Sequence, residues 1–532
     1  MASYFSGALQ ITDLDDFIAP SQECVKPIEI KKADKASDGL IRIQKDGSYV
    51  EEKKDGSKRV LQRAQITLND CLACSGCITS AEHILITQQS SAELLKVLAE
   101  NESCSDQDPA WKLVVVSLSL QSILSLAQKY ALEAQECAKK ICGYLKKKGV
   151  HRIYDISTAS EISLRASTSE FIERWKKRDE DPFALPMLSS ACPGWVCYAE
   201  KTHGNFILPY IARAKSPQQI MGSIVKGHLA RNIFCKKTNQ IFHVTVMPCF
   251  DKKLEASRPD FASPIQDDGN GGIRDVDCVL TSIEIQDMIL KDGVDLTLVD
   301  PENLDEIIPC PDAPIPDHDY TVLGRMGSSS GGFLHRVFLR AAKTLFDTEL
   351  DTVELKQIRN QDFQETILEK NDQAALHFAL AYGFNNIQNM IQKLKRKKAV
   401  GWQYVEVMAC PSGCVNGGAQ IRPDNDEVKP RELASTLSQK YAELPKWDDV
   451  QDALVDDLLK AWLDVRHPGD LSKSNPKTAC LFTEYHAVPK MGKIGLNPSN
   501  PVTRGDLVRI VERRPDLGFV VKRPAERLRG SA

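Results

Sequence analysis

The stretch from residue 241 to residue 255 reads IFHVTVMPCFDKKLE, and it leads from an apolar run through a proline to a cysteine. Its first seven residues are mostly apolar or β-branched, so we expect a strand buried in a parallel sheet. Pro248 interrupts the run, and Cys249 follows at the carboxyl end of the strand. Open parallel sheets hold their ligands at that end. The stretch therefore predicts an α/β fold with a ligand-binding cysteine at the edge of a sheet.

The rest of the chain repeats this alternation of apolar strands with amphipathic helices, which is typical of a parallel α/β sheet. We see no internal repeat. The expected strands besides 241–249 are residues 112–118, 151–157 and 403–410, and the expected helices are residues 121–148, a helix from about 333, residues 387–398 and a helix within 447–463.

Composition limits the classes of function. The chain has 532 residues, of which 42% are hydrophobic and 26% charged, and a net charge of −4, so bulk electrostatics does not predict nucleic-acid or membrane binding. The first thirty residues lack a basic segment followed by an apolar run, so we expect no secretory signal and a cytoplasmic protein. The cytosol keeps thiols reduced, so the 16 cysteines predict metal binding rather than a disulfide framework.

Three further cysteines resemble Cys249 in position, because each lies at or just after the end of a predicted strand. Cys192 lies in LSSACPGW, and Cys410 and Cys414 lie in EVMACPSGCVNGGAQ. Proline or glycine flanks each stretch and lets the backbone turn closely around a ligand. A single cysteine at such a place is more often a packing residue. Together with Cys249, however, they are four thiols, the number that ligates one cubane.

A second set of thiols lies near the N-terminus. The segment DCLACSGCIT places Cys71, Cys74 and Cys77 at two-residue gaps, which lets one short loop wrap a 4Fe–4S cubane. The fourth ligand is remote, and the candidates are Cys24 and Cys104; the polar, aperiodic surroundings of Cys24 favour it. Four thiolates also suit structural zinc, but zinc sites usually take two separated pairs.

The stretches around Cys192, Cys249 and Cys410 resemble, in order, the three signature motifs of the iron-only hydrogenases. The resemblance extends from about residue 65 to residue 490. Residues 247–255 match the second motif throughout, including Lys252 and Glu255. Two further stretches resemble the hydrogenases more weakly, GSSSGGF from residue 327 and LFTEYH from residue 481.

Two departures from the hydrogenase motifs bear on function. The hydrogenases carry a Cys-Cys pair whose first member relays protons beside a diiron centre, and this chain has Ala191 there. Alanine can neither donate nor accept a proton, so rapid proton delivery through this position is excluded. Ala419 replaces the third glycine of the last motif, where we expect its methyl group to crowd a close backbone approach.

With these departures the chain looks like the eukaryotic hydrogenase-like proteins of cytosolic iron–sulfur assembly, also called the nuclear prelamin A recognition factor-like family. That resemblance implies an iron-only-hydrogenase-like, two-lobed parallel-sheet core with a small N-terminal ferredoxin-like cluster-binding region. It implies two 4Fe–4S clusters, no diiron subsite and no enzymatic activity. The implied ligands are Cys24, Cys71, Cys74 and Cys77 for the first cluster and Cys192, Cys249, Cys410 and Cys414 for the second.

The resemblance also implies a task and partners. Members of that family pass clusters from the cytosolic scaffold to a targeting complex, with a WD40-repeat adaptor, and so to cytosolic and nuclear apoproteins. We therefore expect a cytoplasmic protein with the nucleus as a second location. The alternatives are an active iron-only hydrogenase, which the match at Lys252 and Glu255 favours, and a simple iron–sulfur electron carrier.

We expect four regions along the chain. They are an N-terminal iron–sulfur-binding region at 1–110 with a solvated linker at 31–63, a first α/β lobe at 111–240, a second α/β lobe at 241–466 and a C-terminal extension at 467–532.

Overall fold

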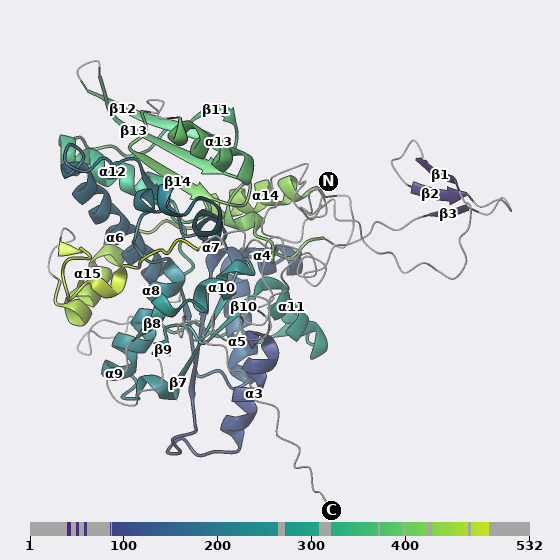
Figure 1. Ribbon diagram of the computed structural model, residues 1–532. Coiled ribbons are helices and arrows are strands. Elements are labelled where there is room, and N and C mark those ends of the chain that lie inside the picture. The colour runs from purple at the N-terminus through teal and green to yellow at the C-terminus, as the bar shows by residue number, and fades with distance from the viewer. Residues whose placement is uncertain are drawn as a thin grey trace, which may run out of the picture. The chain divides into compact units, whose positions relative to one another are not determined.

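The structure is a computed structural model of the whole chain, in which two compact units can be distinguished, Met1–Ala487 and Val488–Ala532. The elements below belong to the first unit (Figure 1). The structure describes residues 40–43, 49–52, 58–60, 86, 88–263, 272–307, 321–370, 373–396, 401–423, 428–465 and 470–488.

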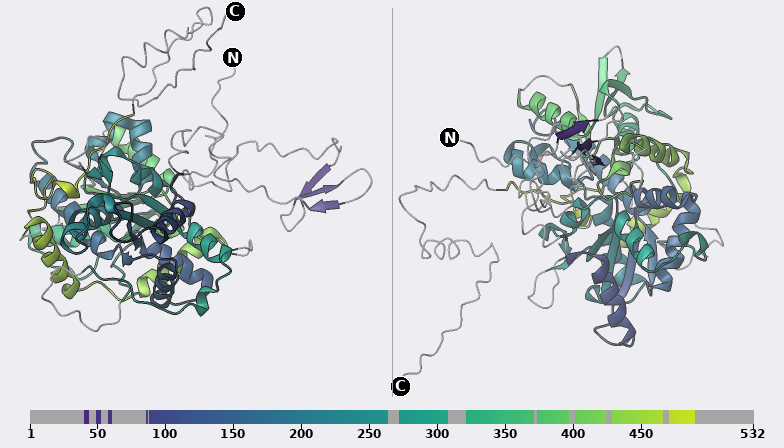
Figure 2. Two further views of the ribbon diagram at one scale, coloured as in Figure 1. Left: turned by 90° about the horizontal axis from the view of Figure 1, so that it is seen from below. Right: turned by 90° about the vertical axis from the view of Figure 1, so that its right-hand side faces the viewer.

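The first sheet is wholly parallel, with the strand order β10-β7-β4-β5. Its strands are β4 (Leu113–Leu118), β5 (Arg152–Asp155), β7 (Ile241–Met247) and β10 (Cys278–Thr281). Val114, Val115 and Val116 of β4 are all fully buried, because helices cover both faces of the sheet (Figure 2). This burial on both faces explains why the strands read as continuous apolar runs.

The helices on the two faces of this sheet form separate cores. Val114 and Val116 pack into one core with helices α3, α4, α5 and α11, whereas Val115 packs into the other with α6, α8 and α15. The alternation follows from the two-residue period of a strand. The helices are α3 (Ser91–Glu102), α4 (Leu120–Tyr130), α5 (Ala134–Lys147), α6 (Ser157–Lys176), α8 (Pro217–Ser223), α11 (Ser282–Lys291) and α15 (Asp449–Leu463).

The single helix expected at 121–148 is wrong, because two helices occupy that segment. Helix α4 ends where Ala131 takes a left-handed conformation with φ of 52°, and α5 starts three residues later. No glycine, asparagine or proline marks the break in the sequence. The apolar period continues across it because α4 and α5 contribute to the same core.

The second sheet has the strand order β11-β12-β13-β14-β6. Strands β6, β14 and β13 pair in parallel, whereas β13, β12 and β11 pair antiparallel. The parallel core is thus confirmed, and the sheet also carries an antiparallel extension that the sequence analysis did not predict. The strands are β6 (Met187–Ser189), β11 (Lys356–Asn360), β12 (Phe363–Lys370), β13 (Gln373–Tyr382) and β14 (Tyr404–Met408).

Helices also cover both faces of the second sheet. One face packs on α12 (Phe333–Phe346) and on the buried Phe171 of α6. The other packs on α7 (Pro193–Tyr198) and α13 (Phe384–Lys395), and Figure 1 shows α12 and α13 beside the strands. The helices expected from about 333 and at 387–398 are confirmed, although α13 begins and ends three residues earlier.

The expected boundaries need three corrections. Each sheet takes strands from both sides of residue 240, so the sheets do not follow the division placed there. The linker at 31–63 contains an antiparallel sheet of β1 (Leu40–Ile43), β2 (Tyr49–Glu52) and β3 (Lys58–Val60). Two Asp-Gly pairs, at 46–47 and 55–56, lie between these strands in the sequence, and such pairs favour hairpins.

The third correction concerns the C-terminal extension expected from residue 467. Leu471, Leu481 and Phe482 are buried in the core between the first sheet and α15. Phe482 also bridges to Ala214, and Thr483 donates its N–H to the Arg213 carbonyl at 2.8 Å. These residues are therefore part of the core. Among the described residues, no helix combines the length and the apolarity that crossing a bilayer demands.

Candidate metal centre

Cys192, Cys249, Cys410 and Cys414 all lie just beyond the carboxyl ends of parallel strands. Cys192 follows β6 and is the N-cap of α7, Cys249 follows β7, and Cys410 follows β14. Cys414 begins the 3₁₀ turn Cys414–Asn416. Strand β7 belongs to the first sheet and β6 and β14 to the second, so the site lies where the two sheets meet.

The four thiols are close enough to influence one another. Burial raises the pKa of each, to about 12 for Cys192 and well above the ordinary value for Cys249 and Cys410. The negative charge of neighbouring thiolates raises the pKa of Cys410 further, with Cys192, Cys249 and Cys414 all contributing. Each residue keeps part of its surface accessible, and none of the four is in a disulfide. Neutral thiols are thus strongly favoured until a cation compensates the thiolates.

Four thiolates can hold a single zinc ion or an iron–sulfur cluster, and the two differ in the spacing of sulfurs that they require. Zinc holds sulfur at about 2.3 Å, which brings four tetrahedral sulfurs within roughly 4 Å of one another. Within the described ranges, no group of three or more His, Cys, Asp or Glu side chains could hold one metal ion. A cluster has a larger frame than one ion, so it accepts four thiolates that lie farther apart.

Backbone and hydroxyl groups hold the two motifs that carry Cys192 and Cys414. The Cys192 N–H donates to the Ser190 hydroxyl at 3.0 Å, and that hydroxyl donates to the Val407 carbonyl at 2.5 Å. The Cys414 N–H donates to the Ser330 hydroxyl at 3.0 Å. Backbone hydrogen bonds also act on the Cys192 thiol and oppose the rise of its pKa. Such bonds to cluster sulfurs adjust the reduction potential.

The turn between Cys410 and Cys414 requires glycine. Gly413 has φ of +80°, a conformation that an L side chain rarely adopts. A Cβ at Gly413 would lie 2.2 Å from the Ser330 hydroxyl. Ser330 therefore fits only because Gly413 has no side chain.

The expected crowding at Ala419 is wrong. Ala419 is fully buried, and its N–H donates to the Pro248 carbonyl at 3.0 Å, so its methyl group is accommodated. The close approach is at Gly417, where a Cβ would lie 2.4 Å from the same carbonyl oxygen. This contact joins the last motif to the residue preceding Cys249.

The roles of Ser190 and Ser330 do not follow from the amino-acid sequence alone. Ser330 belongs to GSSSGGF, which resembled the hydrogenases only weakly, and Ser190 belongs to the first motif. Serine is too common for its type or spacing to indicate a contact with a remote backbone. The resemblance to family motifs was the only available signal.

Lys252 forms an ion pair with Glu255, three residues further along the chain. Its Nζ lies 2.8 Å from Glu255 Oε2, and both side chains are buried. Burial alone lowers the pKa of Lys252, but the Glu255 carboxylate and the thiols of Cys249 and Cys414 outweigh it and raise the pKa. The Ser216 hydroxyl also donates to Glu255. The Lys252 ammonium opposes the rise in the pKa of Cys249, although the pair as a whole carries no net charge.

The space beside Ala191 is nearly filled. The cavity there has a volume of about 20 Å³, enough for about one water molecule. Arg258 and Tyr485 line it, and Arg258 is held by paired hydrogen bonds to Glu200 of 2.8 and 2.7 Å. Thr483 and Tyr485, which both line the cavity, belong to LFTEYH, the second stretch that resembles the hydrogenases weakly.

Seven of the remaining cysteines bear on the proposed ligand sets or on the core. Cys137 and Cys142 are fully buried in the core of the first sheet, so they serve as packing residues. Cys104 follows helix α3 and is half-buried. The four ligands expected for the first cluster lie outside the described residues; they are Cys24, Cys71, Cys74 and Cys77.

Comparison with known proteins shows the family of this chain. Residues 112–418 match the model of the iron-only hydrogenase large subunit, C-terminal domain. A cytosolic Fe-S cluster assembly factor of Xenopus tropicalis is 49% identical over 92% of this chain and 98% of its own length. The cytosolic iron-sulfur assembly component 3 of Mus musculus is 47% identical with the same coverage.

The chain belongs to the cytosolic iron–sulfur cluster assembly factor family. Its fold is that of the iron-only hydrogenases. An FeFe-hydrogenase of Chlamydomonas reinhardtii matches with a TM-score of 0.58 and 22% identity, over 74% of this chain and 98% of that one. A second FeFe-hydrogenase structure, from work on oxygen inactivation, matches with a TM-score of 0.60, also at 22% identity, with the same coverage.

Proposed function

We propose that this assembly factor binds two 4Fe–4S clusters. The observation that carries the second site is that Cys192, Cys249, Cys410 and Cys414 come from three remote motifs and interact within one buried site. The first site rests on the sequence pattern of Cys24, Cys71, Cys74 and Cys77. When bound, the second cluster supplies a buried redox-active iron–sulfur centre.

We infer that the protein carries clusters and does not catalyse hydrogen chemistry. Ala191 offers no group that could move a proton, and the cavity beside it, of about 20 Å³, leaves no room for a pair of irons with their own ligands. The names of the relatives favour an assembly role in the cytosol. The clusters that it passes on are its cargo.

The proposed route runs from the cytosolic scaffold through this protein to a targeting complex, with a WD40-repeat adaptor, and to cytosolic and nuclear apoproteins. Nothing in the net charge of −4 favours direct binding of nucleic acid. We place the protein in the cytoplasm, with a nuclear pool. The buried second site suits slow exchange, and we propose that the first cluster is the more labile.

The first experiment is the iron and acid-labile sulfide content of anaerobically purified protein, with Mössbauer spectra of the same sample. About eight irons and eight sulfides per chain in cubane form would support two clusters. Zinc with little sulfide would contradict the proposal at both sites.

A second experiment separates carrier from enzyme. Cells depleted of their own factor receive either this protein or a variant lacking the second-site thiols, and a cytosolic iron–sulfur enzyme is assayed. We expect activity only with the intact protein. Failure of the cluster-loaded protein to restore the enzyme would contradict the carrier.

The ion pair of Lys252 and Glu255 favours the hydrogenase as a second candidate, because the hydrogenase motif has the same two residues. Carbonyl and cyanide bands in the infrared spectrum of anaerobic protein would support it, and their absence would support the carrier. Reversible voltammetry at one potential would instead indicate a simple electron carrier.

A further inference from the structure

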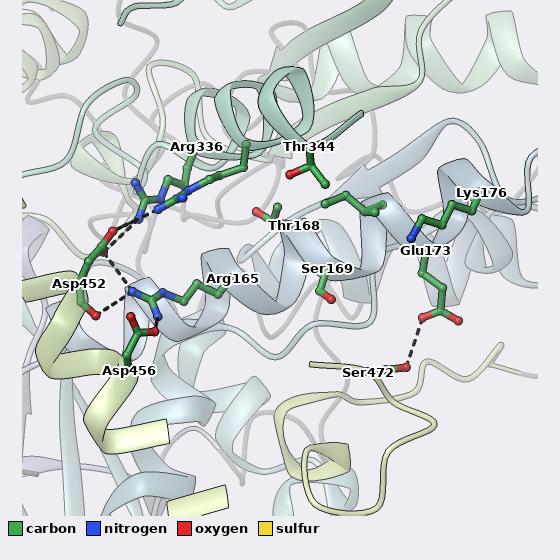
Figure 3. Close-up of a pocket in the computed structure, with 12 residues that line it drawn as sticks. Arg165, Thr168, Ser169, Glu173, Lys176, Arg336, Thr344, Asp452, Asp456 and Ser472 are labelled. Atoms are coloured by element: carbon green, nitrogen blue, oxygen red, sulfur yellow. Dashed lines mark hydrogen bonds and ion pairs between the residues drawn. The ribbon is translucent and has the colours of Figure 1, made fainter. Parts of the chain in front are cut away.

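A second cavity, of about 570 Å³, lies between helices α6, α12 and α15, away from the four cysteines (Figure 3). Its volume falls in the range of sites for small organic molecules. Its lining is rich in charged and hydroxyl-bearing side chains, unlike the apolar cores on either side.

Three guanidinium groups share one carboxylate at one end of this cavity. Asp452 contacts Arg336 at 2.7 Å, Arg165 at 3.2 Å and Arg340 at 3.2 Å (Figure 3 shows the first two contacts). Asp452 also accepts the Trp447 indole N–H at 2.9 Å. The two oxygens of Asp452 are therefore shared among four donors. Within the described part of the chain, Arg340 has only this one carboxylate as an ion-pair partner.

The charges of this network do not cancel. Glu161 pairs with Arg165, Arg325 and Arg336, and Asp456 pairs with Arg165. Four cations thus face three anions. The cations are Arg165, Arg325, Arg336 and Arg340, and the anions are Glu161, Asp452 and Asp456.

Unused donors line the rest of the cavity, beyond the arginines that contact Asp452. They are Ser169, Thr344 and Lys176, and in Figure 3 Ser169 and Thr344 lie between Asp452 and Lys176. Among the described residues, none of these three side chains has a hydrogen-bond or ion-pair partner. Glu173, the nearby acid, is engaged by Lys177 at 2.7 Å and by the Ser472 hydroxyl at 3.3 Å.

We propose that this cavity binds a small molecule carrying an oxyanion, either a phosphate or a carboxylate, between Arg340 and Lys176. A guanidinium with one shared partner and an unpaired ammonium provide charge-assisted donors for such a group. The hydroxyls of Ser169 and Thr344 provide further hydrogen bonds. The anion also balances the excess positive charge of the arginine network.

The test is a thermal-unfolding titration of the full-length, cluster-loaded protein with inorganic phosphate and, separately, with succinate. The visible absorbance of the cluster is followed throughout to confirm that it stays bound. We expect at least one anion to raise the unfolding temperature saturably. A rise with phosphate alone assigns a phosphate ligand, and a rise with succinate alone assigns a carboxylate.

Arg340→Ala and Lys176→Ala should each weaken that binding about tenfold or more, because each removes one charge-assisted hydrogen bond. Arg178→Ala is the matched control, since the Arg178 side chain is 41% exposed against 47% for Arg340 and lies outside the cavity lining. The control should bind as the wild type does. Arg340 and Lys176 are both exposed, so neither substitution disturbs the core. A cooperative unfolding transition in the absence of anion confirms that each variant is folded.

No saturable shift with either anion would overturn the proposal. An equal loss of anion affinity in Arg178→Ala and Arg340→Ala would also overturn it, because that result would indicate general charge screening. The iron content is independent of this titration, so failure here leaves the proposed cluster function untouched, and failure of the cluster assays leaves the anion site standing.

Discussion

The hydroxyl of Ser330 accepts the backbone N–H of Cys414 at 3.0 Å, although 84 residues separate the two in the chain. The same hydroxyl lies where a side chain on Gly413 would have to be. One serine thus fixes the path of the backbone between two of the four proposed ligands, Cys410 and Cys414.

Replacing Ser330 should loosen the second site. Ser330→Ala leaves the Cys414 N–H without its acceptor, which costs about 1–3 kcal/mol for a buried group. We expect faster loss of iron to a chelator under anaerobic conditions. Ser329→Ala is the control, because Ser329 is 7% exposed against 6% for Ser330 and its hydroxyl contacts Ser438, at 3.4 Å, rather than the backbone of a proposed ligand. Equal release rates in both variants would contradict a role for Ser330.

Removing a ligand should remove one cluster. Cys414→Ala should reduce iron from about eight to about four per chain, because a cubane held by three thiolates is lost on purification. Cys278→Ala is the control, since Cys278 is also buried but starts strand β10 away from the site. Iron that stays at the wild-type content in Cys414→Ala would exclude this cysteine as a required ligand.

The turn glycine predicts a difference in stability between two substitutions. Gly413→Ala combines backbone strain at a φ of +80° with a contact of 2.2 Å, whereas Gly293→Ala has φ of +66° and nothing within 4 Å. Backbone strain alone costs about 1–2 kcal/mol. We expect Gly293→Ala to lower the free energy of unfolding by about that amount and Gly413→Ala by clearly more. Denaturant titration measures the free energy of unfolding of both variants. Equal effects would show that the Ser330 side chain moves aside to accommodate the new methyl group.

Restoring the missing cysteine should not create a hydrogenase. Ala191→Cys reinstates the relay residue, but the cavity of about 20 Å³ offers no space for a diiron centre. We expect no hydrogen evolution from the variant with a chemical reductant, and infrared spectra without carbonyl or cyanide bands. Hydrogen evolution by Ala191→Cys would show that the cavity is not the limiting feature.

Acid should destabilise the fold through His243. This histidine is fully buried on β7, its Nδ1 lies 3.0 Å from the Asp275 carbonyl oxygen, and its Nε2 lies 2.9 Å from the Ser117 hydroxyl. Burial lowers the pKa of His243 to about 3, so below a pH of roughly 6.5 only the unfolded chain takes up this proton. The contribution of neutral His243 to stability is full above that value and is lost as the pH falls towards 3.

Between pH 7 and about pH 5.5 this linkage removes about 1 kcal/mol from the free energy of unfolding. His243→Gln should lose less over the same interval, measured by denaturant titration. His486→Gln is the control, because the His486 side chain is 63% exposed. An unchanged pH dependence in His243→Gln would assign the acid sensitivity to other groups.

The sequence by itself determined which residues could be ligands and which kind of fold would carry them. Apolar runs located β4, β5, β7 and β14, because strands buried on both faces need such runs. Cysteines placed just after these strands indicated Cys249 and Cys410, because the carboxyl ends of parallel strands meet at one edge. The resemblance to family motifs then supplied a proposed set of eight ligands, of which four lie in the described residues.

The tertiary structure decided what local patterns cannot express. The left-handed end of α4 at Ala131, the antiparallel extension of the second sheet and the burial of residues 471–482 all depend on packing between segments remote in sequence. The same is true of the bond from Cys414 to Ser330 and of the nearly filled space beside Ala191. Periodicity records which side of an element is buried, but only the folded chain determines which remote residue it meets there.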